Sequence, residues 1–280
     1  AGLQLLRKNL GDEALDLKPF GGYELFLKDD QAFYEHCLQK IPFINEIIKP
    51  LFKTDVFSKD INRFNFGTIF EYLIFNPFEA QIDTGNMMQA LLKKAHQNDI
   101  LILNNQTVTD YQETTENVEV VTNGITFKTN KLLFTTNGFA SKITNNQVQP
   151  ARAQVLITKP IPNLDIKGTF HLDQGYYYFR NINDRILFGG GRNLDFEGET
   201  TTSHDTTKLI QNRLEEVLKR VILPNQDFEI EHRWSGTMGI GNHKKPIIAQ
   251  LSNHVYCGVR MGGMGVAIGS LVGQELADLV

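Results

Sequence analysis

Apolar residues recur along this chain at two spacings, which predict helices and strands in turn. In the helical stretches Gly11 is placed to end the first helix, and Asp29 or Asp30 to cap the second. Asp83 or Thr84 is placed to begin the third, whose apolar face carries methionines, leucines and an alanine. The helices predicted in this way span residues 2–10, 30–40, 84–95, 206–221 and 266–280.

Short runs of apolar, β-branched and aromatic residues between these helices predict strands. Asn123-Gly124 predicts a hairpin turn, and buried strands are expected at 100–103 and 131–136. The aromatic stretch 64–78 is expected to be buried, as a strand or as irregular chain. Helices alternating with strands indicate an α/β fold, and the antiparallel blocks within it indicate an additional α+β unit. The other expected strands span 15–27 (a pair turning at Gly21-Gly22), 107–113, 118–122, 126–128, 153–159, 169–179, 185–189, 228–234 and 254–257.

The end of the chain combines a short strand, a glycine turn and a helix. The turn is Met261-Gly262-Gly263-Met264-Gly265-Val266, between the strand at 254–257 and the last helix. Glycines let the backbone approach a bound molecule, and a helix N-terminus presents unpaired N–H groups with partial positive charge. The same glycines also suit tight packing of a helix on a strand, so the turn alone leaves ligand binding and packing open.

Composition narrows the class of protein. The chain has 280 residues, enough for two domains, and its 41% hydrophobic and 21% charged residues are ordinary for globular proteins. The net charge of −4, without a basic block, argues against a nucleic-acid surface. Cys37 and Cys257 lie far apart and the histidines lack metal-site spacing, so we expect no metal site and a reducing, cytoplasmic location. No apolar run has the length of a transmembrane helix.

Four segments, taken in order, resemble one family. They are 83–108; Asn130 to Ser141, reading NKLLFTTNGFAS; Gln149 to Gln154, reading QPARAQ; and the set Tyr176 to Arg180, Arg185 to Gly190, Trp234-Ser235-Gly236 and the closing glycine turn. Together they are similar to the D-amino-acid oxidase-like FAD-dependent oxidoreductases, which include glycine oxidase, sarcosine oxidase and γ-glutamylputrescine oxidase. The ordered set is more specific than any of its motifs.

The resemblance implies a Rossmann-like FAD/NAD(P)-binding domain interleaved with an antiparallel-sheet substrate domain. The FAD-binding domain would hold residues 1–15, 79–140 and 228–280, and the substrate domain 16–78 and 141–227. Relatives with covalent flavin carry a cysteine soon after the tryptophan, and 237–243 has none, so the resemblance implies non-covalent FAD. The family's opening strand and GxGxxG motif have no match here. We therefore expect a fragment or N-terminally trimmed chain, which alone would bind FAD poorly.

The same resemblance implies a set of site residues. Met238 stands where glycine oxidase-like relatives carry an arginine that pairs with the substrate carboxylate, so an α-amino acid substrate requires Arg260, Arg180 or another cation in its place. His243 and Arg260 are the candidate catalytic residues. Tyr176, Tyr178, Arg180 and Met238 are the candidate substrate residues. The candidate cofactor residues are Val108, Thr136, Asn137, Gly138, Trp234, Gly236, Arg260, Met261, Gly262, Gly263, Met264, Gly265 and Val266.

Several of these residues have plainer interpretations. The tyrosines also suit ordinary sheet packing, His243 a solvated loop, and Val108 a buried strand. Arg152 and Gln154 suit either substrate or interface contacts, or a surface pair on a strand.

The implied function is oxidation of a C–N bond in a small-molecule amine or amino acid to an imine, by hydride transfer to flavin. Two alternatives stay open: a non-catalytic binding or regulatory module that keeps the fold, and a dehydrogenase that passes electrons to a carrier. Met238 and the unmatched N-terminal motif favour the first alternative. The sequence leaves the substrate and the oligomeric state open.

Overall fold

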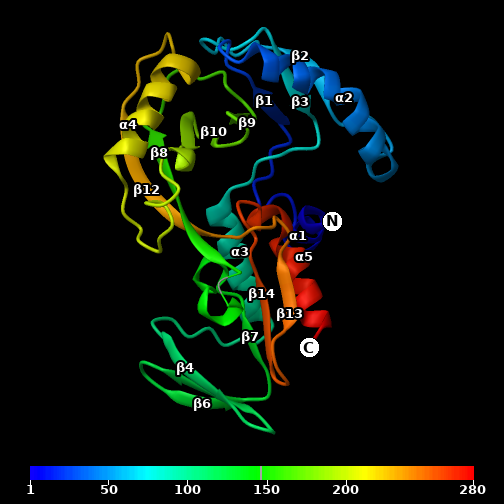
Figure 1. The fold of residues 1–280 in the computed structure, drawn as a ribbon, viewed down its shortest axis with the longest axis vertical. Helices are drawn as coiled ribbons and strands as arrows, with labels where there is room; N and C mark the ends of the chain where they lie inside the picture. The colour runs from blue at the N-terminus through cyan, green and yellow to red at the C-terminus, as the bar shows by residue number, and fades with distance from the viewer. Residues whose placement is uncertain (146) are drawn as a thin grey trace.

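The computed structural model describes residues 1–145 and 147–280 and has two lobes, with a small separate sheet beyond the lower one (Figure 1). The helices are α1 (Gly2–Leu10), α2 (Gln31–Phe52), α3 (Thr84–Gln97), α4 (Lys208–Val217) and α5 (Gly265–Asp278). The strands of the upper lobe are β1 (Gly22–Leu25), β2 (Ser58–Ile61), β3 (Tyr72–Asn76), β8 (Gln149–Thr158), β9 (Thr169–Leu172), β10 (Tyr177–Ile182), β11 (Arg185–Gly190) and β12 (Ile230–Ile240). The remaining strands are β4 (Val108–Glu113), β5 (Val118–Thr122), β6 (Thr126–Thr129), β7 (Leu132–Phe134), β13 (Ile247–Gln250) and β14 (Val255–Val259).

The upper lobe is built on one sheet, called here the large sheet. Within the described residues its order is β12-β8-β11-β10-β9-β1-β3-β2. β1 and β9 run parallel and the other neighbours antiparallel, so the sheet is mixed and not antiparallel as expected. β12, from the stretch expected to bind FAD, pairs along its length with β8 in this sheet. Both strands reach down toward the lower lobe (Figure 1).

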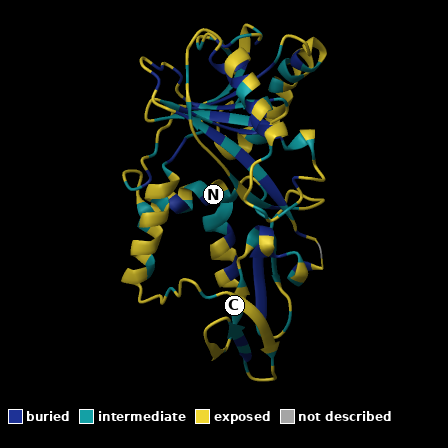
Figure 2. Cartoon of the chain, turned by 90° about the vertical axis from the view of Figure 1, so that its left-hand side faces the viewer, coloured by how far each residue is buried: buried dark blue, intermediate teal, exposed yellow. Residues whose placement is uncertain are grey.

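One face of the large sheet packs against α4 through an aromatic and aliphatic core. Tyr23, Phe170 and Phe179 stack in a row, with ring centroids 5.2 Å apart for Tyr23–Phe170 and 4.6 Å for Phe170–Phe179. Ile210 and Leu214 of α4 belong to the same buried cluster. Because side chains alternate across a strand, the residues that precede and follow each of these rings in sequence lie on the opposite face of the sheet. That face remains only partly buried (Figure 2).

The lower lobe holds a small sheet in which β14 lies between β13 and β7 and runs parallel to β7. Val272 and Leu276 of α5 pack over Gly258 of β14. α3 forms with Asp83 as its cap, as predicted, but none of its residues is buried. No helix in the part of the chain that the structure describes is long and apolar enough to span a membrane.

The expected buried strand at 100–103 is wrong. These residues form no strand, and Leu101 is 80% exposed. A strand needs a neighbour that accepts and donates its backbone hydrogen bonds. Among the described strands, the edge of β7 away from β14 has no neighbour. The hairpin meander β4-β5-β6 with its turn at Asn123-Gly124 is confirmed.

Other boundaries also differ from the sequence prediction. The stretch 169–179 is two strands, β9 and β10, joined by a turn in which Asp173, Gln174 and Gly175 have positive φ. Residues 15–27 contain only β1, which pairs with β3 and β9 and forms no hairpin of its own. α2 is capped by Asp30 as predicted, but it continues to Phe52 beyond Pro42. Asn45 anchors this second half because its side chain accepts hydrogen bonds from the backbone of residues 56 and 57.

Arg152 and Gln154 of β8 are buried on the α4 side, so the surface-pair interpretation is wrong. The Arg152 guanidinium donates to both oxygens of Glu199, at 2.9 and 2.7 Å. Gln154 donates to Glu199 and to Thr207, the residue that caps α4. The cluster therefore ties the 192–201 segment and α4 to the sheet, on the face away from the partly buried one.

We predict that Glu199→Leu lowers the free energy of unfolding by about 3 kcal/mol, because it leaves the Arg152 charge buried without a partner. Urea unfolding followed by circular dichroism measures this. Glu229→Gln, which removes the exposed partner of Lys159, is the control and should change stability little. Equal losses in the two variants would contradict the structural role of the buried pair.

Candidate functional site

Two turns and the end of β12 meet where the two lobes join. Asn137 begins the short 3₁₀ turn Asn137–Phe139, and its side chain accepts a hydrogen bond from the backbone N–H of Met261 at 3.0 Å. Gly262 donates to the carbonyl of Gly239, near the end of β12, at 2.9 Å. Gly138 leaves no room for a side chain, because a Cβ there would lie 2.7 Å from the Met238 carbonyl oxygen. These contacts bring the predicted residues of the three segments together.

The glycine turn presents open backbone. Gly262 has a φ of +56°, and a Cβ at Gly262 or Gly265 would meet no atom within 4 Å. α5 begins within the turn, at Gly265, and its N-cap, Met264, makes no side-chain capping bond. The N–H groups of Gly265 and Val266 have no acceptor among the hydrogen bonds of the described residues. Such donors at a helix N-terminus suit an anion or an electron-rich ring atom.

A row of polar side chains crosses the partly buried face of the large sheet. Glu24 lies opposite His171 in the parallel β1/β9 pair, and His171 lies opposite Tyr178 in the β9/β10 pair. The row continues through Gly189 and Val155 to Trp234 of β12. Directly opposite residues have Cβ atoms about 5 Å apart, so the register alone places Glu24, His171 and Tyr178 side by side.

Arg180 lies in the next row, two residues beyond Tyr178. Its backbone pairs with Thr169 on one side and Leu187 on the other. Its guanidinium makes no hydrogen bond or ion pair with any described residue, whereas every other arginine of this part of the chain donates at least one hydrogen bond. Burial lowers the pKa of Arg180, and the Asp83 charge opposes that shift. A partly buried guanidinium that no described residue pairs with has the donor geometry suited to a carboxylate.

Glu24 is the counterpart of opposite sign. Burial raises the pKa of its carboxyl to about 7, and repulsion from Glu79 adds to the shift. Glu79 lies over Gly22, where no side chain is in its way, and accepts a hydrogen bond from Thr169 at 3.0 Å. Burial also raises the pKa of the Tyr178 hydroxyl. The face therefore carries ionisable groups of both signs in a poorly solvated environment, which is typical of functional sites.

The other predicted site residues are dispersed. Val108 begins β4 of the separate meander and is 49% exposed, so the interpretation as a buried strand valine is wrong. Tyr176 lies in the β9–β10 turn region with its ring against Phe196. His243 is exposed in the loop after β12, and Arg260 donates to the backbone carbonyl of Lys245. The structure does not bring His243 or Tyr176 into the polar row.

Sequence reasoning missed Glu24, Glu79 and His171. The available signal was the alternation of polar with core residues, Tyr23-Glu24-Leu25 and Phe170-His171-Leu172. That alternation shows that Glu24 and His171 leave the core. It does not show that they are neighbours, because their pairing joins strands almost 150 residues apart.

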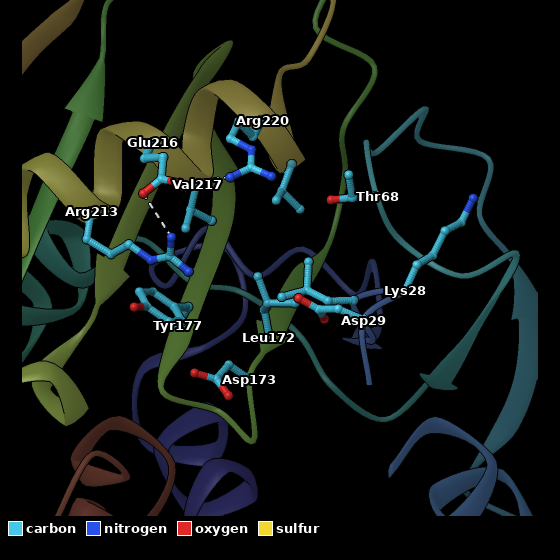
Figure 3. A pocket seen from close by; sticks show the side chains of 12 residues that line it. Lys28, Asp29, Thr68, Leu172, Asp173, Tyr177, Arg213, Glu216, Val217 and Arg220 are labelled. Carbon is cyan, nitrogen blue, oxygen red and sulfur yellow. Dashed lines mark hydrogen bonds and ion pairs between the residues drawn. The ribbon is translucent and has the colours of Figure 1, made fainter. Parts of the chain in front are cut away.

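A pocket of about 400 Å³ lies on the opposite, α4 side of the large sheet (Figure 3). Arg213 and Arg220 of its wall both donate to Glu216, at 2.8 and 2.9 Å. Tyr177, which faces the core, forms another part of the lining. The two arginines are thus already paired with a carboxylate of the protein. This distinguishes the pocket from the face that carries Arg180.

Comparison with known proteins finds one matching family and solved structures with a similar fold. The profile of the family described as FAD dependent oxidoreductase (DAO) matches residues 5–279. No curated protein sequence matches this chain. Similar solved structures include L-proline dehydrogenase from P. horikoshii, with a TM-score of 0.78 and 19% identity over 99% of this chain and 76% of that chain. Glycine oxidase from Geobacillus kaustophilus has a TM-score of 0.80 and 15% identity, over 99% of this chain and 74% of that chain. Iminodiacetate oxidase from Chelativorans sp. BNC1 has a TM-score of 0.74 and 17% identity, over 98% of this chain and 75% of that chain. At these identities the structures establish the fold.

The raised pKa of Glu24 predicts a pH-dependent stability. The folded protein holds the proton of Glu24 up to about pH 7, whereas a glutamate in the unfolded chain releases it near its ordinary pKa of 4.5. The folded state is therefore penalised progressively as the pH rises from about 5 to about 8. Glu24→Gln removes this penalty, so its free energy of unfolding relative to wild type should rise by about 1–2 kcal/mol between these pH values, allowing for partial solvent screening.

Urea unfolding of wild type and Glu24→Gln at pH 5 and pH 8 measures the difference. The exposed Glu197→Gln controls for the loss of one negative charge. A Glu24→Gln difference that is the same at both pH values would contradict the desolvated state of this carboxyl.

Proposed function

The chain belongs to the FAD dependent oxidoreductase family, and we propose that it oxidises the C–N bond of a small amine or amino acid to an imine. The observation that carries the proposal is Arg180, a partly buried cation that pairs with no described residue. It lies on the sheet face that also carries Tyr178 and Trp234. When bound, FAD accepts the hydride equivalent from the carbon beside the amine. The residues of the chain bind the two reactants, orient them and exclude water.

The glycine turn fits the flavin part of this cofactor. No atom lies within 4 Å of the Cβ positions of Gly262 and Gly265, and the N–H groups at the start of α5 that have no acceptor among the described residues would stabilise negative charge on a flavin ring held there. Asn137, which accepts a hydrogen bond from Met261 of this turn, is a proposed neighbour of the flavin, together with Thr136 and Gly138 beside it in sequence. Cys257, the cysteine closest in sequence to the turn, is buried in a β-strand, and the proposed binding of FAD is non-covalent.

Arg180 supplies what Met238 lacks. Met238 lies under the glycine turn, with its sulfur 3.8 Å from the Cβ position of Gly263, and a thioether cannot pair with a carboxylate. Arg180 has the forked donor geometry that carboxylate recognition needs, and Tyr178 adds a hydroxyl two residues away on the same face. We infer that a substrate carboxylate binds at Arg180, which places the substrate over the middle of the large sheet.

The names of the similar proteins support an amino acid as substrate. They include enzymes of L-proline and glycine, and both an oxidase and a dehydrogenase occur among them. The proposal therefore concerns the reduction of the flavin by an amine and leaves the electron acceptor to experiment. The alternative of a non-catalytic module predicts that no amine reduces the bound flavin.

The visible spectrum of the protein loaded with FAD tests the reaction. We expect the flavin bands to bleach when an oxidisable amino acid is added without oxygen. Bands that persist with every amine and amino acid of a broad panel would contradict the proposed oxidation.

Gly262→Ala tests the cofactor site. A side chain at a φ of +56° strains the turn, so we expect about a tenfold loss of FAD affinity, measured by quenching of flavin fluorescence. Gly11→Ala is the matched control, because Gly11 also has a positive φ and open surroundings but ends α1. Both variants should lose stability, and only Gly262→Ala should lose FAD affinity. An equal FAD affinity in the two variants would argue against flavin contact at the turn.

Arg180→Met tests the carboxylate site. We expect kcat/KM for the best amino acid to fall roughly a hundredfold, because a charge-assisted bidentate bond is lost, with Arg180→Lys intermediate. The corresponding amine without a carboxylate should react equally well with wild type and Arg180→Met. The measurement is the rate of anaerobic flavin bleaching. Equal losses for amino acid and amine would place the carboxylate elsewhere.

A further inference from the structure

Two charged side chains of opposite sign, neither of them paired with another described residue, lie on the same face of the large sheet. Glu24 is on β1 and Arg180 on β10, with β9 between them. The two residues are not directly across from each other: Gly22 and Arg180 both pair with Thr169, and Glu24 lies two residues beyond Gly22 along β1. With strands about 4.8 Å apart and about 3.3 Å per residue, their backbone positions are roughly 12 Å apart.

Among the described residues, no cation neutralises Glu24. Glu79 faces it from the segment after β3, His171 from β9 and Tyr178 from β10. Cys37 faces it from α2, and burial together with the Glu24 charge raises the pKa of that thiol. Within residues 1–145 and 147–280 the Glu24 carboxylate takes part in no hydrogen bond or ion pair.

This arrangement is costly for the protein alone. A partly buried carboxylate beside a second carboxylate loses solvation and is repelled by its neighbour. Elsewhere in the chain comparable groups are paired, as Glu199 is with Arg152. A cation delivered by a ligand would remove both penalties at Glu24, just as a carboxylate would at Arg180.

We propose that Glu24 binds the cationic nitrogen of a substrate whose carboxylate lies on Arg180, so that the site selects zwitterions with the two charges several carbons apart. The inference rests on the proposed function, since it specifies the substrate of the same site. His171, between the two strands that carry Glu24 and Tyr178, lines the path along which the carbon chain lies. An α-amino acid without a second nitrogen would occupy Arg180 and leave Glu24 unpaired.

The test is calorimetric titration of the FAD-loaded protein with glycine, 4-aminobutyrate and 6-aminohexanoate at pH 7, in two buffers of different ionisation enthalpy. We expect affinity to rise from glycine to the longer zwitterions. Because a cation favours the ionised form of Glu24, their binding should release protons, which the two buffers reveal. Glu24→Gln should weaken the longer zwitterions roughly ten- to hundredfold, to the level of glycine, and abolish the proton release. Glu229→Gln, a surface carboxylate, should behave as wild type.

Three outcomes would overturn the inference: an affinity that does not depend on chain length, equal affinities in wild type and Glu24→Gln, or no binding of any of the three zwitterions to the wild type. Anaerobic bleaching of the flavin separates this result from the proposed function. If amino acids bleach the flavin but Glu24→Gln binds every probe as wild type does, the proposed oxidation stands and Glu24 does not belong to the site. If probe binding depends on Glu24 but no amine bleaches the flavin, the proposed oxidation is contradicted and the proposed zwitterion-binding site is supported.

Discussion

The alternation of side chains across the large sheet is the constraint on which the rest of the molecule depends. Tyr23, Phe170 and Phe179 are held on the α4 side by ring stacking and by burial in the core. Their neighbours in sequence must therefore lie on the other face. A slip of one residue in the register would bury the Arg180 charge and expose the rings, so the core that stabilises the lobe also positions Glu24 and Arg180.

The distribution of paired and unpaired charges separates scaffold from site. Arg152 with Glu199, and Arg213 with Glu216, are satisfied within the chain and fasten segments to the sheet or along α4. Arg180 and Glu24 are partly desolvated and have no partner among the described residues, which costs stability without a return in folding. Groups of this kind are the expected mark of a surface that binds a charged molecule. The glycine turn at α5 is the place that we propose for the cofactor.

Elements whose signals lie within a few residues of sequence could be predicted, whereas features that depend on distant parts of the chain could not. The spacing of apolar residues predicts α1, α3 and α5, and Gly11 and Asp83 predict the end of α1 and the start of α3. The run 169–179 looks like one strand because its turn lacks an obvious signal before Gly175, yet it forms the β9–β10 hairpin. Leu101 is apolar but has no strand beside it, and the pairing of Glu24 with His171 joins distant parts of the chain. Such features depend on which strands pair in the folded chain, and the spacing of apolar residues does not predict that pairing. The resemblance to a family named Arg260, Arg180 or another cation as the replacement for Met238, and only the structure shows that Arg180 has no partner among the described residues whereas Arg260 donates to Lys245.

The most direct test of this account is a crystal structure of the FAD-loaded protein with an amino acid bound. The account predicts the flavin against the glycine turn before α5 and the carboxylate of the amino acid within about 3 Å of the Arg180 guanidinium. An amino acid bound on the α4 side of the large sheet, or a carboxylate paired with Arg260 while Arg180 remains free, would contradict it.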